Sequence, residues 1–177
     1  LTPTPGTITW DGQDIFSLGS AYRNLLGYLP QDFGYYPDFS VQDYLLYIAS
    51  IKGLRPATAR QRMQNLLEQV GLTQVRRQKM KKLSGGNVQK VLLGREIASN
   101  PRILITAYPV RGLDINSSMT IYRMLNEQKQ KGVAVLYIGE DLDVLLELCD
   151  RIMVLCGGKV TGIVPAQEVT KEQLGLM

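Results

Sequence analysis

The chain has 177 residues and a formal net charge of +4, from 20 Lys and Arg against 16 Asp and Glu. This length suits one domain, with room for a small lobe, that buries its own core without disulfide bonds. The absence of histidine excludes that residue as a base or metal ligand, and no apolar run approaches the ~18 residues of a membrane span. Nothing in the pattern indicates a nucleic-acid-binding module, so nucleic acid is not an expected partner.

Cysteine usage and the N-terminal composition bear on the compartment. Cys149 and Cys156 lie among apolar residues without metal-ligand spacing, so we expect both to be buried and reduced. No signal peptide is recognisable. These features predict a cytoplasmic protein whose link to a membrane is made through a partner.

The N-terminal segment predicts a small antiparallel hairpin followed by a strand. Thr7–Trp10 alternates weakly, Asp11-Gly12 is a turn signal, and Gly12–Ile15 resumes an extended pattern. Leu25–Gln31 is a short apolar strand, and Pro30 ends it because proline cannot donate to a sheet ladder.

Two amphipathic helices come next in the chain. Ser40 and Asp43 form a pair like a capping box ahead of a helix over Val41–Lys52, which Gly53 closes. A second helix is expected over Ala57–Val70. Together the two helices predict a small helical lobe inserted between strands.

The remainder alternates strands and helices, which predicts an α/β fold with a parallel sheet covered by helices on both faces. In order, we expect a helix at Asn87–Ser99, a strand at Ile103–Ile105, a helix at Ser117–Gln130, a strand at Val133–Ile138, a helix at Leu142–Cys149, strands at Ile152–Leu155 and Val160–Val164 joined by a Gly157-Gly158 turn, and a short helix at Thr170–Leu174.

The chain is organised around the stretch Leu83–Glu96. Ser84 is a good helix N-cap, and Gly85 and Gly86 leave backbone amides bare where the helix begins, which makes a ready anion site. For Ser-Gly-Gly alone, a capped helix after a glycine-rich turn is the more frequent explanation. The longer string Leu83-Ser84-Gly85-Gly86-Asn87-x-Gln89-Lys90 changes this balance through the family that it resembles.

This string resembles the signature motif of the ATP-binding cassette (ABC) ATPases. The resemblance implies that Ser84, Gly85 and Gly86 touch the γ-phosphate of an ATP held mainly by a second cassette, with Asn87 and Gln89 beside them. It implies a P-loop NTPase-like α/β fold, with a parallel sheet, flanking helices and a small helical lobe. It also implies ATP and Mg²⁺ as cofactors, bound with a partner cassette, and that second cassette and transmembrane transporter subunits as partners.

Two further positions match the family. Gln31 resembles the Q-loop glutamine, which in the family reaches the Mg²⁺ and the attacking water; the alternative is a surface glutamine at a strand end. Asp114, in the string Arg111-Gly112-Leu113-Asp114, resembles the D-loop aspartate at the dimer interface. The alternative for Asp114 is an N-cap of the next helix.

The groups that would run the chain's own ATP chemistry are missing or substituted. The sequence contains no Gly-x-x-x-x-Gly-Lys-Ser/Thr loop, which in the family would lie before Leu1, so we interpret the chain as a fragment or one completed by another segment. The Walker B Asp-Glu pair falls on Ala107 and Tyr108, and the switch histidine falls on Glu140. We expect no catalytic residue, no metal site and no ATPase activity from the chain alone.

The resemblance divides the chain into three regions. Residues 1–33 hold the hairpin and Q-loop strand of the ATPase core, residues 34–83 form the helical lobe, and residues 84–177 hold the signature helix and the rest of the core. The first half, with Gly27–Gly34, resembles multidrug or antibiotic exporters. From Leu83 the chain resembles the second cassette of simple-sugar and nucleoside importers, a mixture that fits a recombinant or artificial junction there.

The family also implies a role for the helical lobe, whose outer face docks on the membrane subunit. Tyr35, Tyr36 and Phe39 are either exposed docking groups or part of the lobe's own core. The predicted function is the nucleotide-binding domain of an ABC transporter, at the inner face of the membrane, which couples ATP binding and hydrolysis to transport and contributes the signature half of an ATP site. The alternatives are an inert ABC-like dimerisation or docking module and a non-transport ABC protein.

Overall fold

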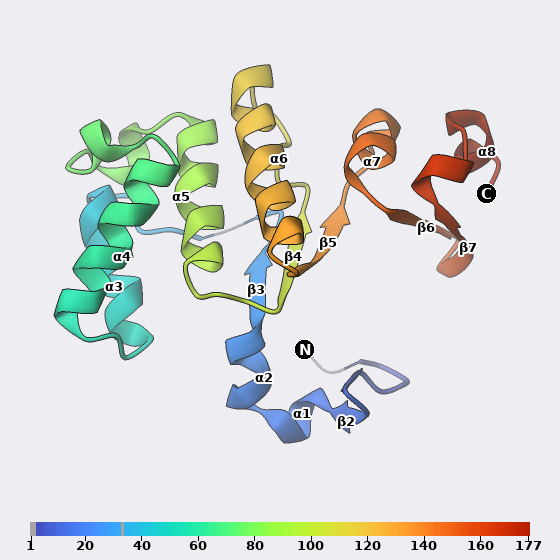
Figure 1. Cartoon of the computed structure of the whole chain (residues 1–177), viewed down its shortest axis with the longest axis horizontal. Coiled ribbons are helices and arrows are strands. Elements are labelled where there is room, and N and C mark those ends of the chain that lie inside the picture. The colour runs from blue at the N-terminus through green and yellow to red at the C-terminus, as the bar shows by residue number, and fades with distance from the viewer. Residues whose placement is uncertain (1–2, 33) are drawn as a thin grey trace. The chain divides into compact units, whose positions relative to one another are not determined.

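The computed structural model in Figure 1 describes residues 3–32 and 34–177. Phe33, which belongs to the exporter-like string, lies outside the described residues together with Leu1 and Thr2. The chain divides into two compact units, Leu1–Leu136 and Tyr137–Met177. Each unit buries apolar side chains of its own.

The first unit holds most of the helices and a strand pair at its N-terminus. Its elements are β1 (Thr9–Trp10), β2 (Gln13–Asp14), α1 (Ile15–Leu18), α2 (Ser20–Leu25), β3 (Leu26–Leu29), α3 (Val41–Ile51), α4 (Pro56–Gln69), 3₁₀ turns at Thr73–Val75 and Met80–Lys82, α5 (Gly85–Ile97), β4 (Ile103–Ala107) and α6 (Ile115–Gln130). The strand β5 (Ala134–Ile138) spans the boundary with the second unit. In the described ranges, none of the helices combines the length and the apolar character that a bilayer span requires.

The N-terminal hairpin is confirmed, with a change at its end. β1 and β2 pair antiparallel, with Trp10 opposite Gln13. The expected extended conformation of Ile15 is wrong, because α1 begins at that residue. Asp14 causes the change: its Oδ1 accepts a hydrogen bond from the Phe16 amide at 2.7 Å and caps the helix.

The strands β3, β4 and β5 form one sheet in that order, with β3 and β4 parallel. Successive side chains of a strand point to opposite faces. Leu29 is fully buried, whereas its neighbour Tyr28 is 49% exposed. In β4, Leu104 and Thr106 are buried, and the residues between them are only half-buried. In the described part of the chain, one face of these two strands is therefore more deeply buried than the other.

The helical lobe contains the two predicted amphipathic helices, α3 and α4, with boundaries within one residue of those expected. Ser40 caps α3, because its Oγ accepts the Asp43 amide at 3.2 Å. α4 packs against α5 where Leu66 meets Gly94 so closely that a Cβ atom at Gly94 would lie 2.3 Å from Leu66 Cδ1. The lobe is thus fitted onto the helix that follows it in the chain.

The aromatic residues before α3 pack on the lobe, and their docking role stays a prediction. Tyr36 and Phe39 stack with ring centroids 5.1 Å apart, and both meet Tyr47 of α3 edge-on. Tyr36 remains exposed, while Phe39 and Tyr35 are half-buried. These rings pack on the lobe and still present one exposed aromatic edge.

The second unit is a strand pair with two helices. Its elements are α7 (Leu142–Leu148), β6 (Arg151–Cys156), β7 (Lys159–Pro165), a 3₁₀ turn at Ala166–Glu168 and α8 (Lys171–Gly175). β6 and β7 pair antiparallel in a sheet of their own. Cys149 is half-buried against the unit's apolar core. Cys156 is exposed at the end of β6, which corrects the expectation that both cysteines are buried.

The helix α6 offers a matched test of the core. Ile121 is 0% exposed and Ile115, on the same helix, is 82% exposed. We expect Ile121→Ala to lower the free energy of unfolding by about 2–5 kcal/mol, because it removes buried methyl groups and leaves a cavity. Ile115→Ala is expected to change it by less than ~0.5 kcal/mol. Urea unfolding followed by circular dichroism measures both variants, and equal losses would contradict this core.

Candidate functional site

The helix α5 begins where the sequence places its cap. Ser84 Oγ accepts the Asn87 amide at 3.3 Å, and the helix runs over the 13 residues Gly85–Ile97. It therefore starts two residues before the expected Asn87. Ser84 and Gly85 are exposed. The partial positive charge of a helix N-terminus is thus presented by a serine and a glycine at the surface.

Gly86 is buried, because α5 approaches the start of α6 at this point. A Cβ atom at Gly86 would lie 2.2 Å from Ser117 Oγ and 2.6 Å from Ser117 Cβ. At Gly85 the corresponding nearest atom is Leu113 Cδ2, at an ordinary 3.6 Å. The second glycine of the motif therefore serves close helix packing, and any side chain there would force the two helices apart.

Asp114 completes this contact. Its Oδ1 accepts the Ser117 amide at 2.9 Å, and its Oδ2 accepts the Ser117 hydroxyl at 2.7 Å. The hydroxyl bond first, and the amide bond second, lower the pKa of Asp114 below its ordinary value. The N-cap interpretation of Asp114 is confirmed, and the structure brings Asp114 to the same corner as Gly85 and Gly86.

The other two candidates of the signature stretch are less accessible. Asn87 is half-buried and lies in the first turn of α5. Gln89 is 6% exposed, and among the described residues its Oε1 has no hydrogen-bond partner. A buried carbonyl oxygen without a partner is costly. Gln89 therefore belongs to the interior of the packing, behind the exposed corner at Ser84.

Gln31 stands apart from this corner. It follows β3 and Pro30, and its side chain is exposed. In the described part of the chain, no recorded hydrogen bond or ion pair joins Gln31 to the start of α5. The structure thus groups Ser84, Gly85, Gly86 and Asp114, and leaves Gln31 as an exposed group at the end of the sheet.

The two positions that the resemblance assigns to the Walker B acids, Ala107 and Tyr108, hold different chemistry. Ala107 ends β4, and Tyr108 follows with a φ of 49°, which is unusual for a residue with a side chain. The Arg111 guanidinium lies over the Tyr108 ring, 6.0 Å from its centroid. Among the described residues, no cluster of three or more His, Cys, Asp or Glu side chains could hold a metal ion. The donor set at Ala107 and Tyr108 does not fit Mg²⁺, because it includes no carboxylate.

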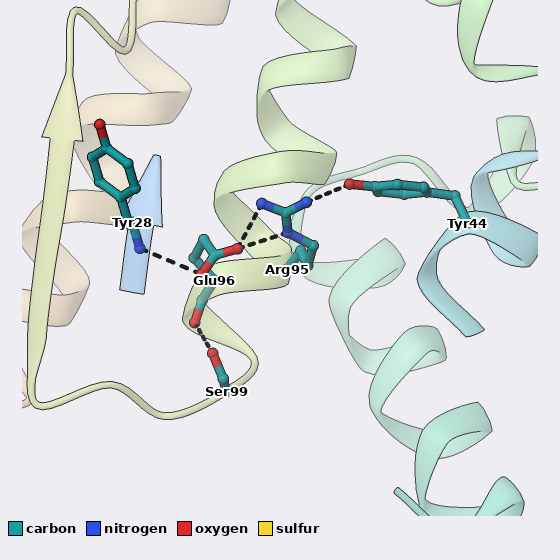
Figure 2. A network of polar contacts seen from close by, with 5 residues as sticks. All are labelled: Tyr28, Tyr44, Arg95, Glu96 and Ser99. Atoms are coloured by element: carbon teal, nitrogen blue, oxygen red, sulfur yellow. Dashed lines mark hydrogen bonds and ion pairs between the residues drawn. The ribbon is translucent and has the colours of Figure 1, made fainter. Parts of the chain in front are cut away.

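Motif matching missed a polar network at the far end of α5, drawn in Figure 2. Arg95 donates from Nε to Glu96 Oε1 at 2.7 Å, and its guanidinium also donates to the Tyr44 hydroxyl of α3. Glu96 Oε2 accepts the Tyr28 amide of β3 at 3.4 Å. Burial raises the pKa of Tyr44. The available signal was a pair of adjacent charges, Arg95 and Glu96, that directly follows the apolar run Val91–Gly94 of the helix.

Arg95 also lines a cleft in the first unit, with a volume of about 410 Å³. Its apolar wall comes from the helical lobe, where Leu45, Ile48 and Met63 face the cleft. The charged residues lining it are all cationic: Arg23, Lys52, Arg62 and Arg95. A cleft of this composition favours a ligand or partner segment that is apolar on one side and acidic on the other.

Comparisons with known proteins agree with this geometry. A sequence model described as ABC transporter matches residues 1–109. The guanosine import ATP-binding protein NupO of Bacillus subtilis is 33% identical over 185 residues, covering 97% of this chain and 36% of that protein. The xylose import ATP-binding protein XylG of Moorella thermoacetica is 42% identical over 92 residues, covering 52% of this chain and 18% of that protein. The chain spans well under half the length of either relative.

A solved structure supports the fold. The protein cbiO1 of Clostridium perfringens, described as part of the ABC transporter complex cbiONQ, has a TM-score of 0.79 and 25% identity to this chain. The likeness covers 95% of this chain and 69% of that one. The predicted α/β fold, a parallel sheet with flanking helices, is thereby confirmed.

The contact between Gly86 and Ser117 yields a direct test. Gly86→Ala puts a Cβ atom into the space of Ser117, so we expect the free energy of unfolding to fall by about 1–3 kcal/mol. The matched change Gly85→Ala meets only an ordinary contact and should cost less than ~0.5 kcal/mol. Chemical denaturation measures both.

A second change checks the cause. Ser117→Gly removes both atoms that a Cβ at Gly86 would strike. In the Ser117→Gly background, Gly86→Ala should therefore cost less than it does in the natural chain. An equal cost in both backgrounds, or equal stability of the two Gly→Ala variants, would contradict the packing role.

Proposed function

This chain belongs to the ABC transporter family, and we propose that it supplies the signature side of an ATP site shared with a second cassette. The observation that carries the proposal is the N-terminus of α5, where Ser84 caps the helix and Gly85 leaves its first turn uncovered. Backbone amides and the helix dipole at such an end favour a phosphate. We assign the γ-phosphate of the partner's ATP to this end.

The corner is already held in place, which supports the assignment. Gly86 packs on Ser117, and Asp114 holds Ser117 through two hydrogen bonds. A phosphate would therefore be received without reorganisation of the helix, the condition under which fixed dipoles stabilise charge best. Asp114 is proposed to lie at the interface with the second cassette. Gln31, exposed after β3, is still proposed as a nucleotide-binding residue, at a place apart from this corner.

Hydrolysis is proposed to take place on the partner cassette. The chain has Ala107 and Tyr108 at the acid positions, and neither side chain is a carboxylate base at neutral pH. Glu140, at the switch position, carries a negative charge that repels a γ-phosphate. Mg²⁺ and the attacking water are then held by groups of the partner.

The names of the relatives favour import. NupO and XylG are named as guanosine and xylose import ATP-binding proteins, and NupO aligns with nearly the whole chain. We propose that the assembly couples ATP binding and hydrolysis to the import of a simple sugar or a nucleoside. Transmembrane subunits would then be partners, and the chain would associate with the membrane through them.

The cleft beside Arg95 is the proposed docking place for such a subunit. Leu45, Ile48 and Met63 offer an apolar wall, and the surrounding cations attract acidic side chains. A short amphipathic segment that carries a carboxylate meets both requirements. The exposed Tyr36 adds an aromatic contact on the same lobe.

Ser84→Arg tests the phosphate site. The arginine removes the cap and covers the first turn of α5, so ATP turnover by the assembled pair should fall by about 100-fold or more. Ser20→Arg, at an exposed serine that opens α2, is the control and should leave turnover within about twofold of the natural chain. Phosphate release by an intact partner cassette mixed with each variant gives the rates. Unchanged turnover with Ser84→Arg would contradict the proposal and favour an inert dimerisation or docking module.

Charge reversal on α4 tests the docking cleft. Arg62 lines the cleft, whereas Arg60, on the same helix, is exposed and does not. We expect Arg62→Glu to weaken binding to the purified transmembrane subunits by roughly tenfold, and Arg60→Glu by less than about twofold. The difference should shrink in high salt, because screening weakens exposed charges. Equal effects of the two variants would argue for general electrostatics rather than this cleft.

A further inference from the structure

We infer that Arg95 and Glu96 are positioning residues that tie the helical lobe to the edge strand β3 and so set the place of Gln31. Neither residue belongs to a recognised motif. The tie itself stands on geometry, and only the role given to Gln31 rests on the proposed function.

Glu96 holds the outer edge of the sheet. β3 is the outer strand in the order β3-β4-β5, so an amide on its free side needs a partner other than a strand. The Tyr28 amide finds that partner in Glu96 Oε2, at 3.4 Å. Because an unpaired backbone amide at a partly buried place is costly, the carboxylate fixes β3 against α5.

Arg95 makes the position of Glu96 possible. Only 11% of the Glu96 side chain is exposed, and a carboxylate in such surroundings needs a compensating charge. The Arg95 guanidinium supplies it, with Nε 2.7 Å and the second terminal nitrogen 2.6 Å from the same oxygen, Oε1. Neighbouring residues on a helix do not ordinarily face each other, so this arrangement depends on what else holds Arg95.

Tyr44 of α3 is that further anchor. It is buried, its hydroxyl accepts a hydrogen bond from Arg95, and the guanidinium lies 5.9 Å from the centre of its ring. Figure 2 shows the resulting line of contacts from α3, through Arg95 and Glu96, to the Tyr28 amide. A displacement of α3 therefore changes how well the Arg95 charge compensates the Glu96 carboxylate. It also affects the hydrogen bond from the Tyr28 amide to Glu96, which holds β3.

Two residues of this line, Arg95 and Tyr28, matter for the proposed function. Arg95 lines the docking cleft, where an acidic group of an occupant would compete with Glu96 for the guanidinium. Tyr28 lies only three positions before Gln31, with Leu29 and Pro30 between them. The network thus connects the occupancy of the cleft with the strand β3, which ends two residues before Gln31.

Amide hydrogen exchange of the 177-residue chain, followed by NMR, tests the tie. The rate for the Tyr28 amide is compared with that of Leu104 in the central strand β4, which reports unfolding of the sheet. Glu96→Ala removes the acceptor and should raise the Tyr28 rate relative to Leu104 by about tenfold. Tyr44→Phe does not touch Tyr28, yet it should raise this ratio by about threefold.

Tyr47→Phe is the matched control, because Tyr47 lies on the same helix and its ring packs edge-on against Tyr36 instead. It should leave the ratio unchanged. In the Glu96→Ala background, Tyr44→Phe should not raise the exchange ratio further, since the contacts from Tyr44 to the Tyr28 amide are already broken.

Three results would overturn the inference: an unchanged ratio in Tyr44→Phe, an equal effect of Tyr47→Phe, or a uniform acceleration of every amide. If Glu96→Ala does not fold, the comparison of Tyr44→Phe with Tyr47→Phe decides alone. The measurement needs no nucleotide, so its failure is distinct from a failure of the ATP site, which Ser84→Arg reports.

Discussion

The approach of Gly86 to Ser117 is the constraint on which the rest of the site depends. Because Gly86 has no side chain, the starts of α5 and α6 meet at a distance that no other residue permits. The same contact holds Asp114 beside the uncovered first turn at Ser84 and Gly85. From there α5 runs to its other end, where Arg95 and Glu96 meet the helical lobe and β3. One helix therefore carries both the proposed phosphate-binding end and the tie to the lobe.

The sequence predicted the local features well, because helix caps and turns are determined by residues that are close together in the chain. Ser40, Ser84 and Asp114 act as N-caps as expected. The packing role of Gly86 was not predictable, since Ser117 lies far along the chain. The pair formed by buried Glu96 and half-buried Arg95 was missed for a related reason: adjacent charges on a helix usually face solvent. The burial expected for Cys156 was wrong because apolar neighbours in sequence do not guarantee a covered strand face.

The chain has groups suited to binding a phosphate but lacks those suited to hydrolysing ATP. Groups that can receive a phosphate remain at the start of α5, held by a hydrogen-bonded corner. At the acid positions the chain instead has Ala107 and a tyrosine, Tyr108, with a cation over its ring, which suits neither a metal ion nor a base. This asymmetry supports the proposed assembly, in which a partner cassette hydrolyses ATP and this chain completes its site.

Calorimetric titration with Mg-ATP tests the central claim most directly. The titration is carried out on this chain alone and then on the chain mixed with an intact partner cassette. We expect no saturable heat from the chain alone, because its 177 residues contain no Walker A loop, and binding with turnover once the partner is present. Tight binding of Mg-ATP by the chain alone would contradict this expectation, since the nucleotide would then be held at a site other than the shared corner at Ser84.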